Sequence, residues 1–430
     1  MASNYAEFRF GWPVVVSAAI GIGLGMSPLP FYTIGVFAGP LAQEFGWGID
    51  QIMLSLAFFT LAAVIASPII GHLTDRYGPR RVALTSIVTF SITMMSFALM
   101  NGSIAYWLGT WCVLAFAGAG TLPITWTRAV TGWFFEKRGL ALGFSLIGTG
   151  LFGLLAKQYA FLMIELVGWR MAYIAVGALP LLIAFPVAWL MFRDASDPAV
   201  ADKVRQLEKK TRKRRVNIGG LSLLQALRDW RFWLLAYAFV PISFAVGGPI
   251  PNMETLLGNK GFSAGDAVTL ASFLGIAVIV GRVVGGYLLD HLWAPVVAAT
   301  ILSLPAIATF MLAQADYSFA YAATAIFILG MAAGVEYDLM AYLVSRYFGL
   351  LHYAAIYGAL YGFFALGAGI GPAVFGAYYE SDGNYDRILL VSSALFVVGA
   401  VPLLLLGKYR DYDEPIEDDS AAATDPEAAG

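Results

Sequence analysis

The most constraining feature of this chain is a series of apolar stretches, each about 20 residues long, that recur from Trp12 to Gly407. An α-helix rises about 1.5 Å per residue, so about 20 residues cross a hydrocarbon core of about 30 Å. Only 13% of the 430 residues are charged, whereas a soluble domain has about 25%. So few charged side chains could not cover a surface in water, and the chain is expected to be an all-α membrane protein.

These stretches predict twelve transmembrane helices in two six-helix bundles. Residues 1–192 hold the first six spans and residues 231–407 the last six, and the basic segment 193–230 is expected to be a cytoplasmic linker. Residues 408–430 form an acidic tail with nothing to bury, which is expected to be disordered. The spans are expected near residues 12–38, 51–72, 82–100, 105–133, 139–162, 169–192, 231–254, 264–289, 294–313, 318–345, 352–378 and 388–407.

Positive charge is unevenly distributed over the segments between the spans. Most of the 26 Lys and Arg residues fall in segments that share one side of the membrane with both termini, and only Arg170, Lys260 and Arg387 fall on the other side. Cytoplasmic loops carry the excess of Lys and Arg in membrane proteins. Both termini are therefore expected in the cytoplasm of a multi-pass protein of a bacterial-type inner (plasma) membrane.

Composition argues against several other classes of protein. The net charge of -2 gives no reason to expect a nucleic-acid partner. The single cysteine, Cys112, excludes an intramolecular disulfide and a thiolate metal cluster, so neither a metal site nor a cofactor is expected. The chain has no H-E-x-x-H pattern and no appended signalling domain, so an intramembrane enzyme or a receptor is the least favoured function. The chain is expected to work as a monomer in the bilayer.

The two halves of the chain repeat one another. Residues 71–75 recur as residues 286–290 at an offset of 215, and Trp133-Phe134 recurs as Tyr347-Phe348 at an offset of 214. Parallel repeats of six helices can rock against each other around a solute held near the midplane of the membrane. The repeat therefore predicts pseudo-symmetric bundles with alternating access.

Three stretches resemble known transporters. Residues 71–81, GHLTDRYGPRR, resemble the loop 2–3 signature of the major facilitator superfamily. Within that superfamily, residues 32–47 and residues 133–148 resemble the monocarboxylate transporter and oxalate/formate antiporter families. This resemblance implies the twelve-helix major facilitator fold and a small organic anion as the transported solute.

The first of these stretches also predicts a conformational latch. A carboxylate at the end of span two can form charge-assisted hydrogen bonds to neighbouring spans, and glycines permit close approach and a tight turn. Alternatively, its arginines only mark the cytoplasmic side. The expected latch residues are Gly71, Asp75, Arg76, Gly78, Arg80, Arg81 and, in the second half, Asp290.

Arg282 is the strongest candidate for binding the solute. A charge in the middle of a transmembrane helix costs about 2.5 to 3.5 kcal/mol on insertion scales, so it is usually paired or functional. A guanidinium can hold a carboxylate through two parallel hydrogen bonds, which a lysine cannot do. The resemblance implies the same role, because the related families keep an arginine in span eight for organic anions. Alternatively, Arg282 pairs with Asp290 and seals the cytoplasmic end.

Two further cations lie inside predicted spans. Lys157 shares one face of span five with Gly143 and Gly150, so it could form a second anion site, pair with an acid or snorkel outward. Arg128 in span four could bind solute, or it could hold the bundle together through a carboxylate or backbone carbonyls.

Two acids in span ten are candidates for proton coupling. Glu336 and Asp338 are about 200° apart on a helix, so only one of them is expected to face the cavity, and the other could be a structural partner. Among uncharged residues, Tyr32 and Tyr361 could contact a carboxylate or stack on an aromatic acid, and Asn252 could line the outer vestibule.

The sequence departs from the related families at the positions of their second charged groups. Residue 278 is Val where monocarboxylate transporters often have an acid, and spans one and eleven lack the lysines that these families carry there. We therefore expect a proton-coupled symporter for a monocarboxylate or an aromatic acid, with Arg282 on the carboxylate and Glu336 or Asp338 taking the proton. The alternatives are an anion exchanger and proton-linked efflux of hydrophobic compounds.

Overall fold

The computed structural model describes residues 6–211, 219–315, 318–410 and 412. This part of the chain is almost entirely helical, with a single isolated antiparallel bridge between Gly220 and Gly349. The residues predicted to form the acidic tail, apart from its first few, lie outside the described residues, as does part of the linker.

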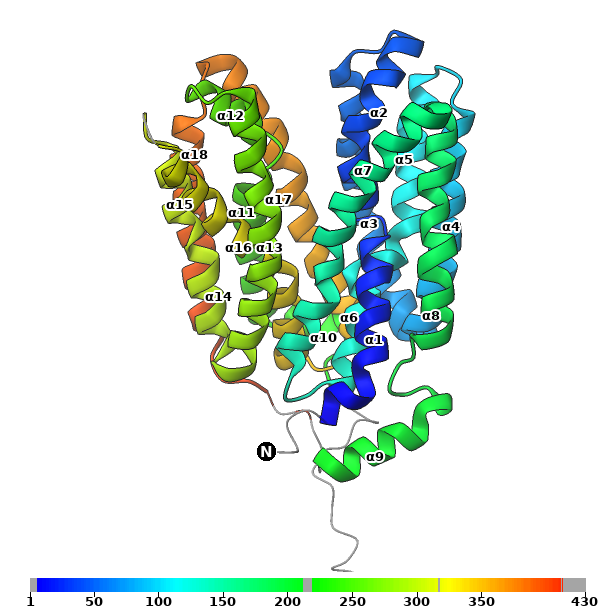
Figure 1. Cartoon of the computed structure of the whole chain (residues 1–430). Coiled ribbons are helices and arrows are strands. Elements are labelled where there is room, and N and C mark those ends of the chain that lie inside the picture. Colours follow the sequence, from blue (N-terminus) through cyan, green and yellow to red (C-terminus); the bar gives the residue numbers. More distant parts are fainter. Residues whose placement is uncertain (1–5, 212–218, 316–317, 411, 413–430) are drawn as a thin grey trace, which may run out of the picture.

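The first half of the chain folds into one bundle of helices that runs from α1 to α8 (Figure 1). Its α-helices are α1 (Ala6–Gly23), α2 (Leu29–Phe45), α3 (Ile49–Tyr77), α4 (Pro79–Ser96), α5 (Ile104–Gly118), α6 (Pro123–Trp133), α7 (Arg138–Leu179) and α8 (Phe185–Met191). Short 3-10 turns at Phe97–Leu99 and Ala119–Thr121 and a π turn at Pro180–Ala184 continue these helices.

The second half folds into a similar bundle after a linker. The linker contains α9 (Ala201–Thr211) and α10 (Leu223–Arg228). The bundle consists of α11 (Trp230–Gly247), α12 (Met253–Asn259), α13 (Ala264–His291), α14 (Ala294–Ser303), α15 (Pro305–Leu312), α16 (Phe319–Tyr347), α17 (Tyr353–Asp382), α18 (Asp386–Ala400) and a 3-10 turn at Val401–Leu406.

The number of crossings is consistent with twelve. Ten helical stretches among the described residues are long and apolar enough to span a membrane, and one of them, Arg138–Met191, has 54 residues. Its glycine at 168 has a φ of 80°, a left-handed conformation that breaks the helix, so this stretch makes two crossings. The pair α1 and α2 supplies the remaining crossing in two pieces.

The first span, expected near residues 12–38, is interrupted in the structure. The helix stops at Gly23 and restarts at Leu29, and residues 24–28 between them are turns. The helix can break here because Gly25 and Pro28 disfavour helical structure. The Met26 N–H, which the break leaves without a partner in its own helix, donates to the Thr121 hydroxyl at 2.8 Å. Thr121 itself lies where the fourth span is broken between α5 and α6, so the two breaks support each other.

The bundles contact each other at one end and diverge toward the other (Figure 1). The contacting end carries α9 and most of the loop arginines and is called the basic end below. Toward the opposite end, an added Cβ at Gly35, Gly39 or Gly275 would meet nothing within 4 Å, so these helix faces border open space.

The contacts between the bundles repeat with the same offset as the sequence. A Cβ on Gly71 would lie 2.1 Å from the Ala354 carbonyl oxygen, and one on Gly286 would lie 2.6 Å from that of Gly139. Likewise, Gly358 packs on the Ser67 carbonyl oxygen and Gly143 on that of Arg282. Each pair becomes the other when 215 is added or subtracted. The α3–α17 seam and the α7–α13 seam are thus pseudo-symmetric equivalents in which backbones touch.

Candidate transport site

An ion pair between Arg282 and Asp338 lies in the interior of the second bundle. The Arg282 Nη1 donates to the Asp338 Oδ1 at 2.9 Å, and their side chains are 3% and 0% exposed. The pair forms because α13 and α16 approach closely, since a Cβ on Gly281 or on Gly334 would overlap the backbone of the facing helix. Buried charges of this kind are paired or functional in membrane proteins.

Arg282 also reaches across to the first bundle. Its Nη2 donates to the Thr149 hydroxyl of α7 at 3.0 Å, while Asp338 lies beside Gly143 of the same helix. Among the described residues, the Arg282 Nε and the Asp338 Oδ2 have no hydrogen-bond partner. Arg282 therefore keeps an unused donor, and Asp338 an unused acceptor, in this buried arrangement.

Glu336 is a second carboxylate close to this pair. The residue is 2% exposed, it lies within electrostatic reach of Arg282, and its Oε1 has no partner among the described residues. Both acids of α16 therefore lie within electrostatic reach of the guanidinium, and which of them faces the cavity stays a prediction. Asp338 contacts Arg282 directly, whereas Glu336 does not.

Aromatic residues extend the site toward the break in the first span. Tyr337 stacks on Tyr361 with ring centroids 5.9 Å apart, and it packs against Phe364 at 4.9 Å. Its hydroxyl also lies near the hydroxyls of Tyr361 and of Ser27 in the broken first span. Tyr32 of α2, also within electrostatic reach of Arg282, covers Gly153 of α7. The site thus combines a guanidinium, two acids and several phenol groups from both bundles.

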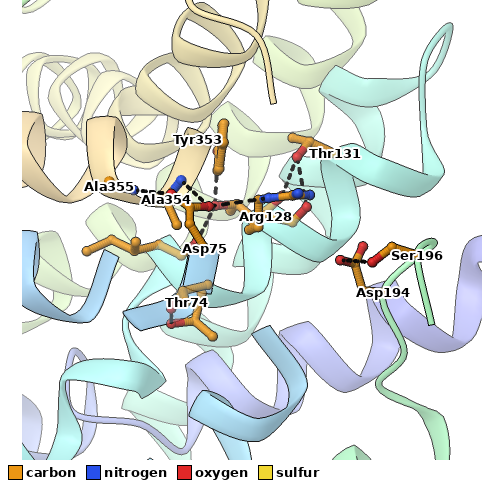
Figure 2. Close-up of polar contacts among 12 residues, drawn as sticks. Thr74, Asp75, Arg128, Thr131, Asp194, Ser196, Tyr353, Ala354 and Ala355 are labelled. Atoms are coloured by element: carbon orange, nitrogen blue, oxygen red, sulfur yellow. Dashed lines mark hydrogen bonds and ion pairs between the residues drawn. The ribbon is translucent and has the colours of Figure 1, made fainter. Parts of the chain in front are cut away.

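Other predicted binding residues lie elsewhere. Arg128 is 3.6 Å from Asp75 at the basic end, so the structure favours its alternative role as a partner for a carboxylate (Figure 2). Asn252 bonds within its own bundle, donating to the Gly248 carbonyl oxygen at 2.8 Å and accepting from the Tyr385 hydroxyl at 3.4 Å. Lys157 is exposed on α7, two turns beyond Gly150, which faces Val278 and Ile279 of α13. A second anion site at Lys157 stays a prediction.

The two aspartates of the predicted latch each bond the start of a helix in the opposite bundle. Asp75 accepts the N–H groups of Ala354 and Ala355 at 3.2 and 2.7 Å (Figure 2). Asp290 accepts those of Gly139 and Leu140 at 2.6 and 3.0 Å. A helix N-terminus carries unpaired N–H groups and a partial positive charge, so a carboxylate stabilises it. Asp290 therefore does not pair with Arg282, which was the alternative reading of that arginine.

The arginines of the same stretch have neighbours other than Asp75 among the described residues. Arg76 is exposed beside Tyr77, and Arg81 is exposed. Arg80 donates to the Trp189 carbonyl oxygen within its own bundle and lies near Asp197. Partial burial raises the pKa of Asp197, but hydrogen bonds from Ala199 and Arg193 outweigh this and leave the pKa below its ordinary value. Gly78, with a φ of 85°, forms the expected tight turn.

Sequence reasoning missed three residues of the site. Tyr337 stands between the two candidate acids, and Thr149 and Ser27 are small polar residues in apolar surroundings. Polar side chains in such surroundings usually hydrogen-bond a buried partner, which is the only signal that could have singled them out. Their partners are on other helices, and no local pattern identifies those.

The family model that describes the Major Facilitator Superfamily matches residues 20–372. The transporter YhjX of Escherichia coli is 28% identical, and the match covers 86% of this chain and 87% of that protein. The cis,cis-muconate transport protein of Acinetobacter baylyi is 26% identical (83% of this chain, 86% of that protein), and monocarboxylate transporter 13 of Bos taurus is 25% identical (94% and 91%).

Solved structures agree with the architecture. The human organic anion transporter MFSD10 superimposes with a TM-score of 0.66 at 16% identity, over 92% of this chain and 99% of that chain. The family match and the transporter-named relatives indicate a membrane transporter and not an enzyme. The chain belongs to the major facilitator superfamily.

Proposed function

We propose that this protein is a proton-coupled symporter for a small organic anion, a monocarboxylate or an aromatic acid. The observation that carries the proposal is the buried Arg282–Asp338 pair with one bond to the opposite bundle. Two relatives of this chain are named for carboxylate substrates, muconate and monocarboxylates. The stacked rings of Tyr337 and Tyr361 beside the pair suit a solute with an apolar body.

Competition between Asp338 and the solute carboxylate for Arg282 couples solute transport to proton transport. In the structure Asp338 occupies the Nη1 donor of the guanidinium. If Asp338 takes up a proton, its charge is cancelled and a solute carboxylate can replace it on Arg282 at little electrostatic cost. When the solute leaves, Asp338 releases the proton and the pair forms again. The transporter therefore changes access between the two sides of the membrane in two states. In one, Asp338 is protonated and the solute is bound; in the other, the site is empty and the Arg282–Asp338 ion pair is formed.

Replacing Asp338 by Asn is expected to uncouple transport from the proton gradient. Asn can still accept from Arg282 but cannot carry the proton, so stimulation of uptake by an inward proton gradient should fall from many-fold to about onefold. Exchange of labelled for unlabelled solute should continue. Both are measured in proteoliposomes with the carboxylate that most raises the melting temperature of the purified protein.

The matched control is Asp386→Asn, since Asp386 pairs with Lys260 away from the site. Should Glu336→Gln uncouple transport while Asp338→Asn does not, the coupling acid is Glu336. An intact gradient response in both variants would contradict proton coupling and favour an anion exchanger.

We further propose that the basic end faces the cytoplasm, because the loop arginines gather there. The state described here would then be open outward. In a Cys112→Ser background, Arg205→Cys on α9, whose side chain is 74% exposed, is expected to react with a membrane-impermeant maleimide only in inside-out vesicles. Gln43→Cys at the opposite end should react in intact cells, and the reverse pattern would contradict the orientation.

A further inference from the structure

The turn between α6 and α7 is held by a buried carboxylate from the beginning of the chain. Glu7 of α1 is 2% exposed. It accepts the N–H groups of Phe135, Glu136 and Lys137 through four contacts of 3.0 to 3.2 Å. Charge-assisted bonds to backbone N–H groups are about twice as strong as neutral ones. The shape of this turn is therefore fixed from within the first bundle.

The same turn leads directly into the helix start that Asp290 binds. The N–H groups of Gly139 and Leu140 follow those bound by Glu7 after a single residue, Arg138. Two carboxylates thus share one short stretch of backbone, and they come from different bundles. The Glu7 contacts lie within one bundle and can persist when the bundles separate, whereas the Asp290 contacts must break.

The second half contains an equivalent device built from backbone instead of a side chain. The Leu221 N–H donates to the Phe348 carbonyl oxygen at 2.8 Å, and the Leu350 N–H donates to that of Gly219 at 3.2 Å. These bonds hold the turn that leads into α17, whose Ala354 and Ala355 bind Asp75. Adding 214 converts Glu7 to Leu221 and Phe135 to Gly349. In each half, residues near the start of the half therefore hold a turn. The N–H groups that follow this turn bind the aspartate of the opposite bundle.

We propose that Glu7 is a positioning residue for the latch. It fixes the turn from 133 to 138 so that the Gly139 and Leu140 N–H groups are oriented toward Asp290. Residues 219–221 fix the corresponding turn before α17 and so orient the N–H groups that bind Asp75. This inference rests on the proposed role of the two aspartates as a latch. Preorganised donors bind a carboxylate without paying the entropy of ordering the turn at the moment of closure. Loss of Glu7 therefore weakens the closed basic end even though Glu7 touches neither aspartate.

The test measures the separation of the two bundles at the end opposite α9. Gln43 on α2 and Thr255 on α12 are exposed, and their helices lie on different bundles at that end (Figure 1). With Cys112 replaced by Ser, spin labels at Q43C and T255C report the distance by double electron–electron resonance. Two distances between the labels are expected. The structure described here gives the longer one, and opening of the basic end gives a shorter one because it brings the labels together.

Glu7→Gln should raise the ratio of short to long distances at least about fivefold, in the range typical of coupling between sites. Gln keeps the shape of Glu7 but replaces one acceptor oxygen by an NH₂ donor that faces backbone N–H groups. Asp290→Asn, which removes the latch contact itself, should produce a shift in the same direction. Asp202→Asn, which removes a fully exposed charge on α9, should leave the ratio unchanged.

A double variant separates positioning from a merely structural role. If Glu7 acts through Asp290, Glu7→Gln should add little to the distance shift of Asp290→Asn, because contacts that act as one unit are not additive. A wild-type distance distribution in Glu7→Gln beside a clear shift in Asp290→Asn would overturn the positioning role alone. If neither variant shifts the distribution, the latch is overturned and this inference with it. A lowered melting temperature with unchanged distances would also refute it, since that is the outcome for a purely structural contact.

Discussion

Replacing Arg282 by Lys is expected to reduce solute uptake strongly although the positive charge is kept. Arg282 uses two different nitrogen atoms, Nη1 for Asp338 and Nη2 for Thr149 in the opposite bundle. A lysine ammonium is a compact point charge on a flexible chain and cannot span both positions with the planar geometry of a guanidinium. Loss of one well-placed charged contact to a carboxylate costs about 2 to 5 kcal/mol when it is buried, so uptake should fall about 30-fold or more.

The measurement is the initial rate of uptake into proteoliposomes, with melting temperature recorded for each variant. Arg170→Lys is the matched control, because Arg170 pairs with Glu44 at 2.6 Å but is 43% exposed at the end opposite α9. Surface pairs contribute about 0 to 1 kcal/mol, so this variant should transport normally. Normal uptake by Arg282→Lys would remove the assignment of Arg282 to the solute carboxylate.

The position of Arg282 could be predicted from the sequence, but its partner could not. A charged residue within an apolar stretch indicates a buried functional group regardless of which helices surround it. The partner depends on how α13 and α16 pack. Asp290 was a plausible partner two turns along the same helix, yet its carboxylate points to the N–H groups of Gly139 and Leu140 in the other bundle.

The breaks in the first and fourth spans were hidden for a different reason. The mean hydropathy stays high across residues 24–28, so averaging over a window of about 20 residues predicts a single span. The break is stable because the Thr121 hydroxyl accepts the Met26 N–H from a distant part of the chain. Such compensation of free backbone groups by a neighbouring helix is a tertiary property, and only Gly25 and Pro28 hint at it locally.

The repeat was the most informative sequence feature for the latch. The offset of 215 relates Asp75 to Asp290 and also the N–H groups that each of them binds, Ala354 and Ala355 to Gly139 and Leu140. Arg76, Arg80 and Arg81 follow Asp75 closely in the sequence. The helix geometry instead brings Arg128 from the fourth span to it.

Replacing Gly71 by Ala is expected to prevent the closed arrangement of the basic end. An added Cβ would lie 2.1 Å from the Ala354 carbonyl oxygen, and a carbon and a carbonyl oxygen cannot approach so closely without a shift of the backbone. The α3–α17 seam must therefore open. The ratio of short to long distances between labels at 43 and 255 should rise about tenfold or more, and transport should fall because the cycle no longer visits this state.

Gly286→Ala tests the pseudo-symmetric seam, where the added Cβ would lie 2.6 Å from the Gly139 carbonyl oxygen. It should shift the same ratio in the same direction, since both seams close the same end. Gly109→Ala on α5 is the matched control, because nothing lies within 4 Å of its added Cβ. Alanine is favoured over glycine in a helix by about 0.5 to 1 kcal/mol, so neither seam variant should lose transport by unfolding. Wild-type distances and transport in Gly71→Ala would show that contact between the backbones of α3 and α17 is not required for closure.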